Sequence, residues 1–184
     1  MMNHTANPRM KDNHMNTKFL TSTTIAAAFA ASVALADAGH DSGIGEPGAA
    51  AMVDRTVTVE MDEMKFDPET IKVQPGETIR FEVVNVGRMV HEFNIGTSET
   101  WDGHREEMQK MMREGMMTAQ SLNHDRMIES GMMHDDANSA LLEPGETGEV
   151  IWTFPQGGEI GFACNVPGHR EAGMQGGFQL GDGS

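Results

Sequence analysis

Two blocks of alternating apolar and polar residues limit the folds that this chain can adopt. In the first block, apolar side chains recur at about every second position through TVTVEM (56–61), TIKV (70–73) and IRFEVVNV (79–86). In the second block, GEVIWTF (148–154) alternates in the same way, and the apolar stretch IGFAC (160–164) follows it. A period of two with many β-branched residues, interrupted by Pro-Gly turns, predicts antiparallel strands. Several short strands at this spacing indicate an all-β sandwich, in which two sheets bury alternate residues.

The segment between the two blocks has no strand pattern. From Trp101 to His134 it contains eight methionines and three histidines among charged residues. Met, Glu, Lys and Gln favour helices and Met recurs at four-residue steps, so a helix is predicted from at least Arg105 to Ala119. An insertion of this length is too long for an ordinary loop. We therefore expect a Met/His-rich, partly helical insertion at about residues 101–136.

The first 36 residues have the layout of a secretory signal. A mostly apolar, Ala-rich stretch follows Lys18 and ends in Ala34-Leu35-Ala36, which fits an A-x-A cleavage site. Its apolar core, Ile25–Leu35, is far shorter than the ~20 residues that a bilayer requires, so a cleaved signal is favoured over a transmembrane anchor. Met15 offers an internal start. We expect export to the periplasm and no membrane span after signal removal.

The chain that remains after cleavage is strongly acidic. Removal of residues 1–36 takes away three of the 13 basic side chains and one of the 28 acidic ones, which leaves a formal charge of −17. Such a charge repels phosphate backbones, so nucleic acid is excluded as a partner, whereas cations and basic protein surfaces are favoured. Residues 37–52 are rich in Gly, Ala and acid, which predicts a flexible arm. The folded domain is then residues 53–184.

The stretch FACNVPGHREAGM (162–174) contains the only cysteine of the chain. Cys164, His169 and Met174 follow one another at five-residue steps, in a stretch that also contains Pro and Gly. One thiol cannot form an internal disulfide, so the alternatives are a buried inert thiol and a metal ligand. A copper site of the electron-transfer kind uses two imidazoles, one thiolate and a weak axial thioether. This loop supplies all of these donors except the second imidazole.

His91 is the candidate for that second imidazole. It lies just after the predicted strand 79–86, in GRMVHEFNIG, and is the one histidine in a strand-like context with apolar residues on both flanks. A neighbouring strand of a sandwich would bring it to the same end as Cys164. Two distant segments would then contribute four side chains to one metal ion.

Together, HEFNI (91–95) and FACNVPGHREAGM (162–174) resemble the cupredoxins, the small type 1 copper proteins, over about residues 53–180 apart from the insertion. With its Met/His-rich insertion the chain is most similar to periplasmic copper-tolerance cupredoxins of the CopI type. The resemblance implies a Greek-key β-sandwich and a copper cofactor that cycles between Cu(I) and Cu(II). It also implies a function in copper tolerance, with an electron shuttle to a redox partner protein as the alternative. The ligands that it implies are His91 and His169 as equatorial nitrogens, Cys164 as thiolate and Met174 as axial thioether.

One residue departs from the family pattern. Many cupredoxins have an amide or hydroxyl side chain directly after the first histidine ligand, whereas this chain has Glu92. An ionised carboxylate can only accept hydrogen bonds. Contacts of this kind tune copper potentials, so the potential and colour of blue relatives are not carried over. Asn85 and Asn165 are candidates for tying the copper loops together, with turn stabilisation as the alternative.

The insertion suggests a second, weaker copper site. Thioethers are soft ligands that suit Cu(I), and imidazole serves either oxidation state. At helical spacing several of its side chains would share a face. The candidate ligands are His104, Met108, Met112, Met116, His124 and Met127. The alternative is that the methionines pack against the sandwich, because Met fills irregular gaps well.

The sequence lacks the common motifs of multicopper oxidases, hydrolases and nucleotide-binding enzymes. The chain contains no H-x-H pair of the kind that multicopper oxidases use for oxygen reduction. It also contains no G-x-S-x-G, H-E-x-x-H or phosphate-binding loop. We expect a copper-binding protein rather than an enzyme; oxidation of Cu(I) would need a second copper ion or an external electron acceptor.

Overall fold

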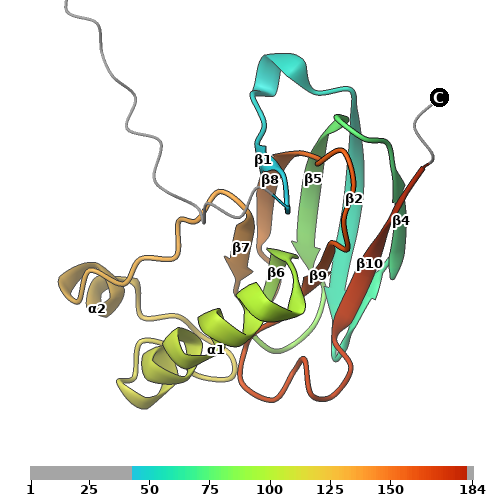
Figure 1. Ribbon diagram of the computed structural model, residues 1–184. Helices are drawn as coiled ribbons and strands as arrows, with labels where there is room; N and C mark the ends of the chain where they lie inside the picture. The colour runs from blue at the N-terminus through green and yellow to red at the C-terminus, as the bar shows by residue number, and fades with distance from the viewer. Residues whose placement is uncertain (1–42, 182–184) are drawn as a thin grey trace, which may run out of the picture. The chain divides into compact units, whose positions relative to one another are not determined.

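Two five-stranded sheets pack face to face in the computed structural model, which describes residues 43–181 (Figure 1). The first sheet has the order β1 (Glu46–Pro47), β8 (Thr147–Thr153), β5 (Thr78–Asn85), β2 (Arg55–Asp62), β3 (Lys65–Asp67). The second has the order β4 (Thr70–Val73), β10 (Gln175–Leu180), β9 (Gly161–Ala163), β6 (His91–Gly96), β7 (Ser139–Leu142). The predicted all-β sandwich is confirmed.

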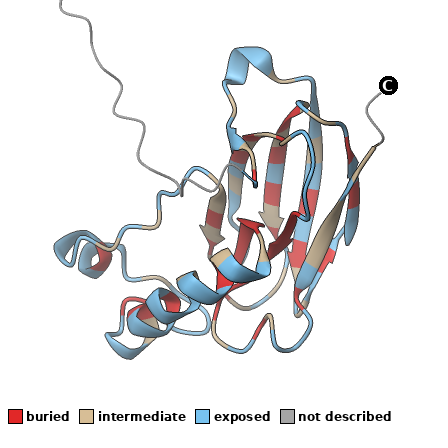
Figure 2. Cartoon of the chain, in the orientation of Figure 1, coloured by how far each residue is buried: buried red, intermediate tan, exposed pale blue. Residues whose placement is uncertain are grey.

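The core lies between the two sheets. Phe81 of β5 packs against Phe93 of β6 with 5.4 Å between the ring centroids, and Phe93 lies 5.2 Å from Phe162 of β9. All three rings are fully buried. Buried residues recur along the strands, whereas much of the helical surface is exposed (Figure 2). The alternation in the sequence therefore reports the inward faces of the strands.

Two of the strand pairings are parallel, so the expectation of antiparallel strands is wrong there. β2 pairs with β5 in parallel, with Val57 opposite Phe81, and β10 pairs with β4 in parallel, with Phe178 opposite Ile71. Between β2 and β5 the chain passes through β3 in the same sheet and β4 in the other sheet. A strand buried on one face alternates in the same way whatever the direction of its neighbour, so the pattern carries no information on direction.

The start of the described chain is attached to the sandwich. Residues 37–52 are predicted to form a flexible arm, but β1 pairs antiparallel with β8 and a short 3-10 turn spans Ala50–Met52. Ile44 is buried, and its carbonyl accepts a hydrogen bond from Trp152 Nε1 at 2.7 Å. The carbonyl of Ile44 satisfies the buried indole N–H of Trp152, and the Ile44 side chain adds buried apolar surface. The composition of residues 37–52 does not predict either contact. The predicted signal (1–36), the start at Met15 and residues 37–42 lie outside the described residues.

The insertion connects β6 to β7 and is partly helical, with α1 at Ser98–Arg113 and α2 at His124–Glu129. Helix α1 begins earlier than predicted because Thr97 and Thr100 form a capping box, in which each side chain accepts a hydrogen bond from the backbone N–H of the other. Within residues 43–181, neither helix is long and apolar enough to cross a bilayer.

Helix α1 also ends earlier than Ala119, the predicted limit. Gly115 has φ +68°, a left-handed conformation, and directly follows the C-cap residue. The N–H of Met116 donates to Met111 O and that of Gly115 to Met112 O, which is the pattern of a Schellman motif. The favourable helix propensities around this glycine do not indicate where the chain turns.

Two glycine substitutions test this account of α1. Gly115→Ala places a side chain in a left-handed conformation and is expected to lower the free energy of unfolding by about 1 kcal/mol. Gly103→Ala lies inside α1, where an added Cβ meets no atom within 4 Å. It is expected to raise that free energy by roughly 0.5–1 kcal/mol. Urea unfolding of the metal-free protein measures both, and a stabilising Gly115→Ala would contradict the assigned helix end.

Candidate metal centre

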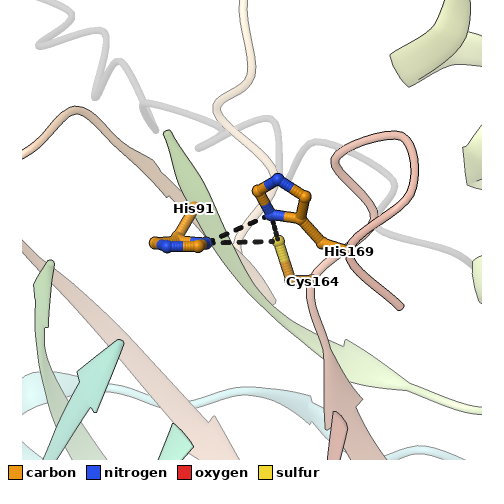
Figure 3. A group of neighbouring side chains, drawn as sticks. All are labelled: His91, Cys164 and His169. Carbon is orange, nitrogen blue, oxygen red and sulfur yellow. Dashed lines mark hydrogen bonds between the residues drawn. The ribbon is translucent and has the colours of Figure 1, made fainter. Parts of the chain in front are cut away.

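Three of the predicted ligands meet at one end of the sandwich. His91 is the first residue of β6, Cys164 directly follows β9, and His169 lies in the turn beyond it. β6 and β9 pair antiparallel, with Asn94 opposite Ala163, so the start of one strand lies beside the end of the other. The two imidazoles and the thiol converge there (Figure 3).

The spacing of the donor atoms fits a single metal ion. The Nδ1 atoms of His91 and His169 lie 3.2 Å apart, and Cys164 Sγ lies 3.3 Å from His169 Nδ1 and 4.0 Å from His91 Nδ1. Three metal bonds of roughly 2.0–2.3 Å at 120° separate their donors by roughly 3.5–4.0 Å. The observed triangle is close to this, and its two imidazoles and one thiol are the donor set of a trigonal type 1 copper site.

Burial sets the protonation of these donors. Loss of solvent lowers the pKa of His91, and together with the neighbouring His91 it lowers the pKa of His169 to about 4. Both imidazoles are therefore neutral at pH 7 and offer a lone pair. Burial raises the pKa of the Cys164 thiol far above its usual range, although the backbone N–H of Glu92 donates to the sulfur at 3.3 Å and opposes this shift. A bound metal ion supplies the positive charge that a thiolate needs here.

Met174 is held in the same loop by its backbone. Its N–H donates to His169 O at 3.0 Å, and its carbonyl accepts from the N–H of Cys164 at 3.1 Å. Gly173, at φ +103°, turns the chain so that Met174 returns to the cysteine. The side chain of Met174 is fully buried. Its role as axial ligand, like the ligand roles of the other three residues, stays a prediction.

The loops that carry the ligands are tied together by amide side chains. Asn85 Nδ2 donates to Met89 O at 2.8 Å and to Leu142 O at 2.9 Å, which fixes the loop before His91. Glu92 Oε2 accepts from both the N–H (3.1 Å) and the Nδ2 (2.9 Å) of Asn165. The carboxylate at position 92 therefore joins the two ligand segments as an acceptor, with Asn165 as the donor.

The residues predicted for a secondary copper site lie in different environments. Met108, Met116 and Met127 are buried in the hydrophobic core, and Met112 packs partly buried against it. The structure thus favours the packing interpretation for these four methionines. His124, the first residue of α2, is exposed.

His104, the remaining candidate, contacts two residues that were not predicted as ligands. Its Nε2 lies 3.0 Å from Glu92 Oε1 and 3.0 Å from the Nε2 of His134. Although burial alone would raise it, hydrogen bonds from both imidazoles hold the pKa of Glu92 well below its usual range. Conversely, the contact with Glu92 outweighs burial and raises the pKa of both histidines. His134 lies outside both helices, so the helical periodicity of the sequence could not identify it as a neighbour of His104.

Several known proteins are similar to this chain in sequence. Residues 51–181 match the plastocyanin/azurin family of copper binding proteins. The copper-resistant cuproprotein CopI of Pseudomonas aeruginosa is 40% identical over 154 residues, which cover 78% of this chain and 85% of that protein. The protein of the same name from Rubrivivax gelatinosus is 40% identical over 165 residues, covering 82% of this chain and 89% of that protein.

Solved structures support the fold at lower identity. Auracyanin B superimposes with a TM-score of 0.56 at 20% identity, covering 75% of this chain and 96% of that chain. The dithionite-reduced auracyanin of Roseiflexus castenholzii gives a TM-score of 0.51 at 21% identity, covering 71% and 99%. Sequence, fold and donor set agree: the chain belongs to the plastocyanin/azurin family of copper-binding proteins, within which it groups with the CopI cuproproteins, and its cofactor is copper.

Proposed function

We propose that this protein binds copper in the periplasm at a mononuclear type 1 centre and protects the cell against excess copper. The main support is the buried triangle of donor atoms from His91, Cys164 and His169, next to which the loop places the backbone of Met174. The named function of the CopI relatives, copper resistance, supports the same conclusion. The predicted N-terminal signal supports the location.

The donor set suits a redox-active ion. Cu(I) favours sulfur and low coordination, whereas Cu(II) favours nitrogen and oxygen in tetragonal geometry. Two imidazoles, one thiolate and a weak thioether satisfy neither state fully, so either state is held with little rearrangement. Burial of His91 and Cys164 in a packed end of the sandwich keeps the donors in place. The protein would sequester copper and exchange electrons with a partner protein at this centre.

The alternative is an electron shuttle of the plastocyanin/azurin kind, and the position of the insertion argues against it. A shuttle needs an exposed histidine edge, but His169 is only 3% exposed. Helix α1 packs beside the ligand loop, where Arg170 pairs with Asp102 and lies over the ring of Trp101. The N–H of Val90, next to His91, donates to Ala119 O of the insertion at 2.8 Å. The insertion thus contacts both segments that carry ligands.

Copper tolerance is tested by complementation. In a host that lacks the gene, the wild-type chain is expected to raise the copper concentration that stops growth, whereas Cys164→Ser is not, because the thiolate is required for the centre. Both proteins must accumulate to equal levels in the periplasmic fraction. Equal growth of the two strains, with a respiratory defect in the deletion strain instead, would favour the shuttle.

Substitution of the thiol tests the ligand assignment directly. Cys164→Ser is expected to abolish the intense visible absorption of the copper-loaded protein, because that absorption arises from charge transfer between thiolate and Cu(II). The hydroxyl is nearly isosteric, so the far-ultraviolet circular dichroism is expected to be unchanged. Persistent colour in the variant would exclude Cys164 as a ligand.

Substitution of the axial thioether tests the fourth ligand. Met174→Leu is expected to retain copper and to raise the reduction potential, because loss of a ligand lowers the coordination number, which Cu(I) tolerates better than Cu(II). Met112→Leu is the matched control, since Met112 belongs to the insertion and packs partly buried against the hydrophobic core. Redox titration of the two variants compares them, and an unmoved potential in Met174→Leu would contradict axial ligation.

A further inference from the structure

A second triangle of potential ligands lies on the other side of β6 from the core. Glu92 Oε1 lies 3.0 Å from His104 Nε2 and 2.9 Å from His134 Nε2, and the two nitrogens lie 3.0 Å apart. The three residues come from β6, from α1 and from the segment between α2 and β7. Glu92 is fully buried, and the side chain of His134 is 4% exposed. Three parts of the chain that are distant in sequence therefore bring polar atoms together at one largely buried position.

The far side of each imidazole faces a carboxylate. His104 Nδ1 lies 3.3 Å from Glu107 Oε2, and His134 Nδ1 lies 3.8 Å from Asp136 Oδ2. A carboxylate near Nδ1 favours a proton on that nitrogen and a lone pair on Nε2, the arrangement that histidine ligands of metal ions usually have, although neither contact is a hydrogen bond in this structure. The two rings stack with 4.7 Å between centroids and 11° between their planes. Both Nε2 atoms are thus oriented together with Glu92 Oε1.

Hydrogen bonds alone do not satisfy this cluster. Glu92 Oε1 already accepts a hydrogen bond from Ser139 Oγ at 2.9 Å, and a carboxylate oxygen offers two lone pairs. Asn94 Nδ2 makes a longer contact with the same oxygen at 3.5 Å, so N–H groups from both imidazoles would place four donors on it. The same two N–H groups would also lie 3.0 Å from each other, nitrogen to nitrogen. A cation that contacts Oε1 and both Nε2 atoms removes both conflicts.

The donor spacing indicates which cation fits. Metal bonds of roughly 2.0–2.2 Å at right angles separate their donors by roughly 2.8–3.1 Å. The observed separations of 2.9–3.0 Å fall in that range, whereas the triangle around Cys164 is wider. Two imidazoles and a carboxylate at mutual right angles occupy one face of an octahedron, and among the divalent first-row metals Cu(II) binds such nitrogen and oxygen ligands most tightly.

We infer that Glu92, His104 and His134 form a second metal site, which binds Cu(II) through two nitrogens and one oxygen. This site uses none of the type 1 ligands, and the inference does not depend on whether the protein confers copper tolerance. The two sites are adjacent, because Glu92 follows His91 and its backbone N–H donates to Cys164 Sγ. The methionine-rich insertion thereby contributes imidazoles rather than thioethers.

Titration of the metal-free full chain with Cu(II) tests this site. The double variant His104→Gln/His134→Gln is expected to bind about one copper ion fewer per chain than the wild type, because two of three ligands are lost. It is expected to keep the thiolate absorption and to lose a paramagnetic resonance signal with nitrogen hyperfine splitting and no thiolate character. His124→Gln is the matched control, an exposed histidine of the same insertion that is expected to lose neither.

The comparison between variants cancels any copper bound by the histidines near the N-terminus. Equal copper content in the wild type and the double variant would overturn the inference, as would loss of the ion in His124→Gln alone. Repeating the titration with an equal concentration of Zn(II) is expected to leave copper in the site. Zinc retained there in place of copper would overturn the assignment of the metal.

A measurement on the wild type covers the case in which the double variant misfolds. Crystals of the copper-loaded full chain, recorded at the copper absorption edge, are expected to show an anomalous peak among Glu92 Oε1 and the two Nε2 atoms. This peak is separate from the one at Cys164. Absence of density at the second position, with the first occupied, would overturn the inference without any substitution.

Discussion

The pairing of β6 with β9 is the constraint on which both clusters of potential ligands depend. Asn94 lies opposite Ala163 in the antiparallel ladder, which places the N–H of Glu92 on the sulfur of Cys164 and its carboxylate on Asn165. Successive side chains of a strand point to opposite faces, so adjacent residues serve different surroundings. His91 therefore turns to the imidazole and thiol, whereas Glu92 turns to the insertion. A shift of one residue would exchange the two and destroy both clusters.

The insertion makes a carboxylate at this position tolerable. All six residues of β6 are buried, which is unusual for a strand with charge on one face, because the insertion covers its outer side. A buried carboxylate is costly unless it is paired and hydrogen-bonded. Glu92 accepts hydrogen bonds from Asn165 and Ser139, and the Nε2 atoms of two histidines lie within 3.0 Å of its carboxylate. Burial lowers the pKa of all four imidazoles, but only His104 and His134 share the close carboxylate of Glu92, so the pKa falls for His91 and His169 and rises for His104 and His134.

The sandwich and the loop with Cys164 and His169 could be predicted from the sequence because both depend on local pattern: alternation for the strands, and a short run of spaced donors. His91 lies 73 residues before Cys164, and its strand context and the resemblance to the cupredoxins identify it. The rest depends on tertiary neighbours. Parallel pairing of β2 with β5 leaves the alternation unchanged, and the attachment of residues 43–52 depends on the buried indole of Trp152. Methionine is both a soft ligand and a good core residue, so its frequency cannot separate the two roles. Glu92 departs from the family pattern in the sequence itself, but its partner His134 lies 42 residues away in an irregular segment.

The two triangles differ in a way that assigns them different chemistry. The donors around Cys164 include sulfur and are spaced for trigonal bonding, so an ion there can change oxidation state with little movement. The donors around Glu92 are nitrogen and oxygen at nearly right-angled spacing, which favours Cu(II) and disfavours its reduction. An ion at the inferred second site would neutralise the carboxylate of Glu92, the residue whose backbone N–H contacts the sulfur of Cys164. An ion at the inferred second site would therefore alter the electrostatics of the cluster around Cys164 through a single residue, Glu92.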